Sequence, residues 1–94
     1  MRFALVPLAF ALLAAPAVAA PTEAQKAEFY QVCVGISGDA ALCSCKADAA
    51  MSLIDERFMS VVISSMKGGT PASADYAAYN TYVAKSNQIC KPNY

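Results

Sequence analysis

The stretch that decides the fold is CVGISGDAALCSC, residues 33–45, in which Cys33 is followed by the closely spaced pair Cys43 and Cys45. A fourth cysteine, Cys90, lies near the end of the chain. An even number of cysteines in a short chain, downstream of an apolar leader, is typical of a disulfide framework formed in an oxidising compartment. We therefore expect two disulfide bonds to staple a small fold.

Residues 1–19 have the organisation of a cleaved secretory signal peptide. Met1-Arg2 supplies a positive start, and the apolar stretch that follows is too short to span a bilayer comfortably. Ala17-Val18-Ala19 is a small-x-small cleavage site. We place the cut after Ala19, because a cut one residue later would leave Pro21 directly after the scissile bond. The prediction is a leader over residues 1–19 and one domain over residues 20–94, in a periplasmic or secreted protein.

The mature part, about 75 residues, is near the size at which a hydrophobic core alone gives little stability. It carries six basic and seven acidic residues, a net charge of −1, with no block of either sign. A nucleic-acid partner or an anionic membrane requires a basic stripe, and the sequence has none. We expect neither partner, and no stable membrane span in the mature chain.

Helix-period patterns run through the mature chain, and the segments end at proline and glycine. Residues that favour a helix start precede four of these segments: Thr22 (with Gln25 as a capping box), Asp39 or Ser37, Asp55-Glu56, and Thr70-Pro71. The expected fold is all-α, a small bundle of about four short helices stapled by two disulfides. Whether the second and third helices are continuous through Ile54 stays open, because no proline or glycine separates them.

Helix geometry limits how the cysteines pair. Positions i and i+2 point about 200° apart on a helix, so Cys43 and Cys45 are expected to reach different partners. Two connectivities remain. We favour Cys33–Cys43, because these residues flank the turn between the first two helices, together with Cys45–Cys90. The second bond follows because Cys45 shares a stripe with Leu42, Ala49 and Leu53 that should face the remaining helices.

Three chemistries compete with a purely structural role for these residues. Cys-x-Cys with Met51, Met59 and Met66 could suggest a Cu(I) site, but methionines at helical spacing are usually core residues. A dithiol redox site normally uses Cys-x-x-Cys beside a βαβ unit. Ser64-Ser65-Met66-Lys67 matches Ser-x-x-Lys, but the companion motifs of that hydrolase class are missing. With no histidine in the chain, we expect no catalytic residue, no metal ligand and no cofactor.

Tyrosines form a cluster in the last predicted helix. Tyr76, Tyr79 and Val83 are expected to face the core, with Cys90 on the same stripe. Tyr82 falls off this stripe, and exposed tyrosine is favoured at protein interfaces. We therefore single out Tyr82 as a partner contact.

The pattern Phe29-x-x-x-Cys33-x₉-Cys43-x-Cys45, followed by a helix and Cys90, resembles a group of small exported four-cysteine bacterial proteins. The likeness covers most of the mature chain and implies an exported helical scaffold, not an activity. Plant lipid-transfer proteins also staple helices through Cys-x-Cys, but with eight cysteines. Periplasmic immunity proteins and acid-stress chaperones share the size and compartment; the former carry a glycine-tyrosine signature missing here, and the latter differ in cysteine number.

The sequence thus predicts a non-enzymatic exported protein that binds a protein partner or supports the envelope. One alternative is a carrier of a small ligand or lipid, indicated by the Met-, Val- and Ile-rich third helix. Another is a protein that resembles periplasmic immunity proteins or stress chaperones.

Overall fold

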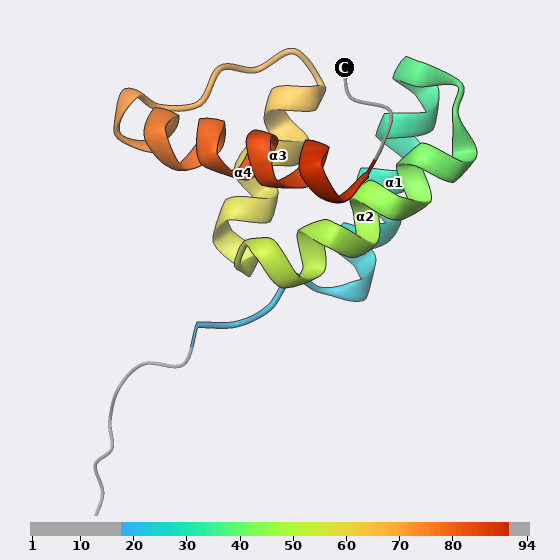
Figure 1. Ribbon diagram of the computed structural model, residues 1–94. Coiled ribbons are helices and arrows are strands. Elements are labelled where there is room, and N and C mark those ends of the chain that lie inside the picture. Colours follow the sequence, from blue (N-terminus) through green and yellow to red (C-terminus); the bar gives the residue numbers. More distant parts are fainter. Residues whose placement is uncertain (1–17, 91–94) are drawn as a thin grey trace, which may run out of the picture.

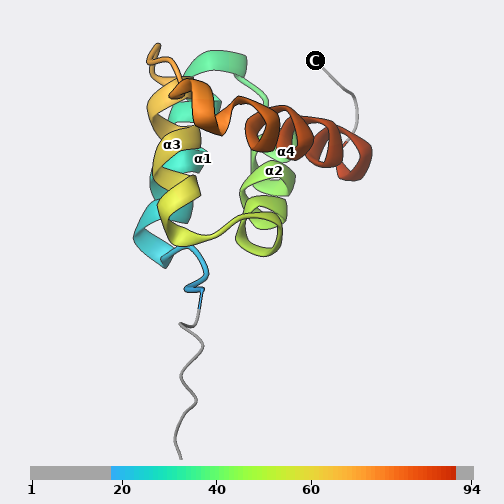
Figure 2. The ribbon, with the colours of Figure 1, turned by 90° about the vertical axis from the view of Figure 1, so that its left-hand side faces the viewer.

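The computed structural model describes residues 18–90 and shows an all-α protein (Figure 1). Its elements are α1 (Glu23–Ser37), α2 (Ala40–Leu53), α3 (Glu56–Met66), the short 3-10 helix η1 (Ser73–Asp75) and α4 (Tyr76–Ile89). α1 contacts both α2 and α3, and α4 contacts α2. Figure 2 shows α1 beside α3 on one side of the molecule and α2 beside α4 on the other. The predicted bundle of four helices is confirmed; most of the predicted leader lies outside the described residues.

The predicted capping box at the start of α1 is confirmed. The Thr22 hydroxyl accepts from the Gln25 backbone N–H at 3.0 Å, and the Gln25 side chain accepts from the Thr22 N–H at 2.9 Å. The Gln25 amide nitrogen also donates to the Glu56 carbonyl at 2.9 Å and to the Ser60 hydroxyl at 3.0 Å. One side chain therefore both caps α1 and joins it to α3.

The turn between α1 and α2 uses residues that the sequence marks. Gly38 has a φ of 70°, the left-handed conformation that glycine adopts without steric cost. Asp39 is the N-cap, and its carboxylate accepts from the Leu42 N–H at 3.0 Å. Ser37 stays within α1, where its hydroxyl accepts from the Asp39 N–H at 3.1 Å. Of the two N-cap candidates, Asp39 is therefore the one used.

α2 and α3 are separate helices, which settles the question left open by the sequence. Ile54 is extended, with φ −137° and ψ 164°, and the Asp55 carboxylate accepts from the Phe58 N–H at 2.7 Å. The Glu56 N–H, which has no partner inside α3, donates to the Ala19 carbonyl at 2.8 Å. An aspartate cap and one strand-like residue thus make the break that no proline or glycine marks.

The predicted start of the fourth helix at Thr70-Pro71 is wrong. α4 begins at Tyr76, after η1, and its first residues receive no side-chain cap. Asp75 stands at the N-cap position, but its carboxylate accepts from the Arg57 guanidinium at 3.0 Å instead. As the last residue of η1, Asp75 already has a helical backbone (φ −97°, ψ −6°), unlike the extended N-caps Asp39 and Asp55, so it does not cap α4 and its carboxylate pairs with α3.

The core has a larger and a smaller part, and α2 contributes to both. Cys43, Ala47 and Ala50 face the larger part, which α1 and α3 complete through residues such as Phe29 and Met59. A neighbouring face of α2 packs in a smaller cluster of Leu42, Ala49 and Cys90, joined by the partly buried Cys45 and Leu53. The predicted stripe over Leu42, Cys45, Ala49 and Leu53 is therefore confirmed, but it is the minor of two buried faces.

Both favoured disulfides are present. Cys33–Cys43 joins α1 to α2, with 5.6 Å between the Cα atoms, and Cys45–Cys90 joins α2 to the end of α4, with 5.8 Å. They close loops of 10 and 45 residues. By the chain-entropy relation these bonds stabilise the fold by roughly 3 and 4 kcal/mol. Cys43 and Cys45 fasten α2 to two other helices, as the i and i+2 geometry requires.

Candidate functional site

The cysteines considered for metal or redox chemistry, and the lysine of the Ser-x-x-Lys match, all have structural partners. All four cysteine sulfurs lie in disulfides, so none is a free thiolate. The lysine of the Ser-x-x-Lys match, Lys67, forms an ion pair with Glu28 of α1. The structure therefore moves attention from the cysteines to the surroundings of α4.

The prediction that Tyr82 lies off the core stripe is wrong. Its side chain is buried, with 6% of its surface exposed, whereas Tyr76 is 45% exposed. Three residues make almost one helical turn, so Tyr82 shares a face with Tyr79, and the buried face of α4 is rotated toward Tyr82 and away from Tyr76. A tyrosine this buried packs in the core and cannot present a contact surface to a partner.

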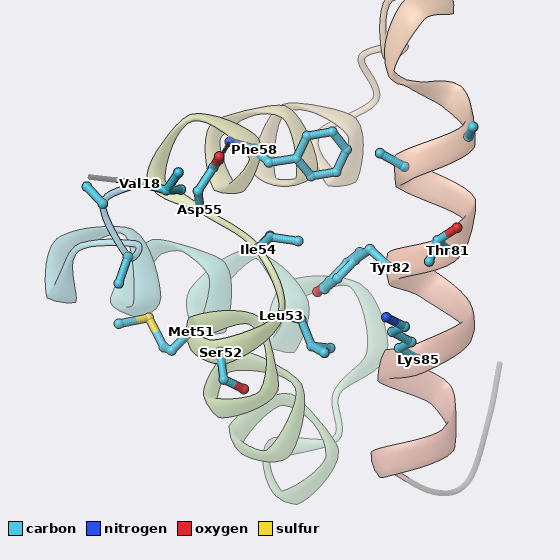
Figure 3. Close-up of a pocket in the computed structure, with 14 residues that line it drawn as sticks. Val18, Met51, Ser52, Leu53, Ile54, Asp55, Phe58, Thr81, Tyr82 and Lys85 are labelled. Atoms are coloured by element: carbon cyan, nitrogen blue, oxygen red, sulfur yellow. Dashed lines mark hydrogen bonds between the residues drawn. The ribbon is translucent and has the colours of Figure 1, made fainter. Parts of the chain in front are cut away.

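Two cavities lie against α4, and Tyr82 contributes to the wall of both. The first, which we call the N-terminal groove, has a volume of about 760 Å³ and is the more open of the two. Val18–Ala20 form one side of it, the end of α2 and the link to α3 form another, and α4 closes it. Figure 3 shows Tyr82 projecting from α4 toward Leu53 and Ile54, with the Phe58 ring above them. Because two residues of the predicted leader form part of this wall, the groove would change on processing.

The second, which we call the central cavity, has a volume of about 500 Å³ and is lined by all four α-helices. Its lining residues are Phe29, Cys33, Ile36 and Ser37 from α1, Leu42 and Lys46 from α2, Val62 and Met66 from α3, and Tyr79, Tyr82, Val83 and Ser86 from α4. Aliphatic, aromatic and sulfur-containing side chains make up most of this wall. None of its lining residues belongs to the predicted leader, so removal of residues 1–19 would leave these walls in place.

Lys46 and Ser86 add polar groups to this wall from the neighbouring helices α2 and α4, beside the hydroxyls of Ser37, Tyr79 and Tyr82. Ser86 is 2% exposed, and its hydroxyl has no hydrogen-bond partner among the described residues. Lys46, half-buried on α2, donates from Nζ to the side chain of Asn87, the residue next to Ser86, at 2.8 Å. Burial lowers the pKa of Lys46 because the cavity wall shields its ammonium from water.

Burial also raises the pKa of Tyr82, to about 12, because the low-dielectric surroundings disfavour the phenolate. The nearby Ser86 hydroxyl opposes this shift, although the two hydroxyls do not reach hydrogen-bonding geometry. Tyr82 is therefore a neutral wall residue at physiological pH.

Ser86 and Lys46 were not among the site residues predicted from the sequence. Ser86 lies between Val83 and Cys90 at helical spacing, so it was visible as a serine within an apolar stripe. Lys46 carries no such signal, because its neighbour Asn87 is 41 residues away in sequence. Only the packing of α4 on α2 brings these groups to one wall.

None of the helices in the described part of the chain is long and apolar enough to cross a membrane. Comparison of the chain with protein-family models, with curated proteins and with solved structures finds no match.

Proposed function

We propose that this protein is a non-enzymatic binding protein of an oxidising, extracytoplasmic compartment and that it carries a small apolar ligand in the central cavity. The observation that carries the proposal is the cavity itself, about 500 Å³ between four helices. Pockets for small molecules are usually concave, mostly apolar, and roughly 300–1,000 Å³ in volume. The central cavity has all three properties.

The disulfides support this role because they hold the cavity walls in place. Cys33–Cys43 fixes α1 against α2, and Cys45–Cys90 fixes the end of α4 against α2. Without such links the helices of a small domain can move together and close an apolar cleft, because burying apolar surface is favourable. The two bonds also favour the periplasm or the extracellular space as location, because disulfides persist in oxidising compartments.

The test is native mass spectrometry of protein freshly purified from its exported form. A carrier retains an adduct of defined mass that denaturation releases, and the extracted compound rebinds to the stripped protein. Protein that is adduct-free from the start, and that binds no apolar compound in dye-displacement titrations, would contradict the proposal.

A protein partner remains a second candidate, now on different residues. Ile36 is 66% exposed at the rim of the central cavity, and Tyr76 and Ile89 are also exposed. These side chains lie at three different helix ends, and single exposed apolar residues are common on protein surfaces. A pull-down from envelope extract that loses its partner with Ile36→Asp would support this candidate over the carrier.

A further inference from the structure

Ser86 places a buried hydroxyl group in the wall of the central cavity. A hydroxyl that is buried without a hydrogen bond destabilises the folded state by roughly 1–3 kcal/mol. Ser86 lines the central cavity, and its Oγ is unpartnered but has less than 1 Å² of accessible surface, so a ligand atom reaches it only after a small shift of the surrounding side chains. A ligand atom that accepts or donates a hydrogen bond at this position would remove the penalty.

Lys46 gives that position a charge. It is the one ionisable cation among the described residues that line the central cavity, and none of those residues is an acid. The salt bridges of the described chain use Lys26, Arg57 and Lys67, not Lys46. Its ammonium is held by a neutral amide, on Asn87, which leaves its positive charge uncompensated. An anion beside it would offset the desolvation that lowers its pKa.

Away from Lys46 and Ser86 the walls of the cavity are mostly apolar, apart from the hydroxyls of Ser37, Tyr79 and Tyr82. These walls include Phe29, Val62 and Met66 from α1 and α3. Unbranched apolar chains and flexible methionine side chains adapt to each other's shape. The cavity therefore has a polar, cationic end at the contact of α2 with α4 and an apolar body between α1, α3 and α4.

We infer that the central cavity binds a single-chain amphiphile with a carboxylate head, such as a medium-chain fatty acid, with the carboxylate at Lys46 and Ser86 and the chain between α1, α3 and α4. This inference rests on the proposed function and adds the class of ligand. The lysine ammonium and the serine hydroxyl each donate a hydrogen bond to the carboxylate, and charge-assisted bonds of this kind are the stronger ones. A neutral alcohol of equal chain length fills the same apolar space but leaves the lysine charge uncompensated.

The experiment titrates the exported protein with dodecanoate and with dodecanol, below the concentrations at which they self-associate, by isothermal titration calorimetry. We expect dodecanoate to bind more tightly than dodecanol. Lys46→Gln should weaken dodecanoate binding by roughly tenfold or more, since a charged hydrogen bond is lost, and should leave dodecanol binding within about twofold. Lys85→Gln is the matched control: this lysine lies on α4 but lines the N-terminal groove, so its loss should change neither affinity.

Ser86→Ala supplies a second, independent test. It should weaken dodecanoate binding while raising the melting temperature of the ligand-free protein, because the unpartnered hydroxyl is removed. If Ser86 served only packing, the substitution would lower both the affinity for dodecanoate and the melting temperature, or would change neither. Circular dichroism and mass measurement of the two disulfides confirm that each variant folds.

The outcomes separate the two claims. If neither compound binds, the carrier function itself fails. If both bind equally and Lys46→Gln is without effect, the carrier function stands and the carboxylate inference is overturned. If affinity for dodecanoate depends on Lys85 and not on Lys46, the site is the N-terminal groove and the inference is wrong.

Discussion

α3 and α4 are two short helices that pack into the same small protein by different means. α3 is capped by Asp55 and buries four apolar side chains: Phe58, Met59, Val62 and Ile63. α4 has no side-chain cap and buries only Tyr82 and Ser86, one of which is an unpartnered serine. The two cavities also lie against α4. In α3 local sequence and tertiary packing agree, and in α4 they do not.

The difference is consistent with the binding role proposed for the surroundings of α4. Proteins that fold to one structure satisfy capping, patterning and polar pairing together, and departures concentrate at functional sites. α4 has an uncapped start, a buried unpartnered hydroxyl and a neighbouring desolvated lysine. α3 completes the core and contributes Val62 and Met66 to the cavity wall, whereas α4 is held on α2 at its end by the Cys45–Cys90 disulfide.

The largest expected effect on the contrast between α3 and α4 comes from removing the Cys45–Cys90 disulfide. Cys45→Ala with Cys90→Ala should destabilise the protein by about 4 kcal/mol, against about 3 kcal/mol for the shorter loop of Cys33→Ala with Cys43→Ala. Because α4 buries so little, amide hydrogens in α4 should exchange before those of α3 in the first double variant. Equal loss of protection in both helices would show that α4 is as firmly integrated as α3.

The next largest effect concerns Tyr82. Tyr82→Ala should cost about 3 kcal/mol, because it removes a buried aromatic ring from the wall between two cavities. Tyr76→Ala, on the exposed side of the same helix, should stay within about 0.5 kcal/mol of the parent protein. Urea denaturation of both variants measures the difference, and similar losses would mean that the buried face of α4 is assigned wrongly.

Stability at alkaline pH tests the burial of Tyr82 without removing its ring from the core. The folded-state pKa of Tyr82 lies above its unfolded value, so its contribution is complete below about pH 10 and is lost as pH rises toward about 12. The loss from this one group is about 3 kcal/mol. Comparing stability against pH for the parent and Tyr82→Phe isolates it from the other tyrosines and from alkaline damage to the disulfides. Parallel curves would show that the hydroxyl is not buried.

The smallest effect compares the two aspartates that precede these helices. Asp55→Ala should destabilise the protein by about 1 kcal/mol, because the cap on the Phe58 N–H is lost. Asp75→Ala removes only an ion pair whose arginine is largely exposed, and should cost less than about 0.5 kcal/mol. Thermal denaturation of the two variants measures this, and a reversed order would contradict the assignment of caps.

The scaffold was largely predictable because its determinants are local. Thr22 with Gln25, Gly38 with Asp39, and the spacing of Cys43 and Cys45 each act within one turn of chain. The start of α4 was not predicted from Thr70-Pro71, since η1 comes first and Asp75 pairs with Arg57, which is 18 residues away. The leader over residues 1–19 stays a prediction.

The candidate site was less predictable for the same physical reason. The pattern of apolar residues in α4 predicted that Tyr76 is buried and Tyr82 exposed. In the structure α4 packs against α2 with Tyr82 buried and Tyr76 exposed. Ser86 was visible in the pattern, but Lys46 joins it only through contacts between distant segments. The starts of α1, α2 and α3 depend on neighbours in sequence, whereas the central cavity depends on neighbours in space.

The most direct test of the central claim is a nuclear magnetic resonance titration of the isotope-labelled protein with dodecanoate. The account predicts saturable shifts at the methyl groups of Val62, Met66 and Val83, at the amide of Ser86 and at the ammonium of Lys46, which all line the central cavity. Shifts confined to Ile54, Phe58 and Thr81, which line the N-terminal groove, or no saturable shifts at all, would contradict it.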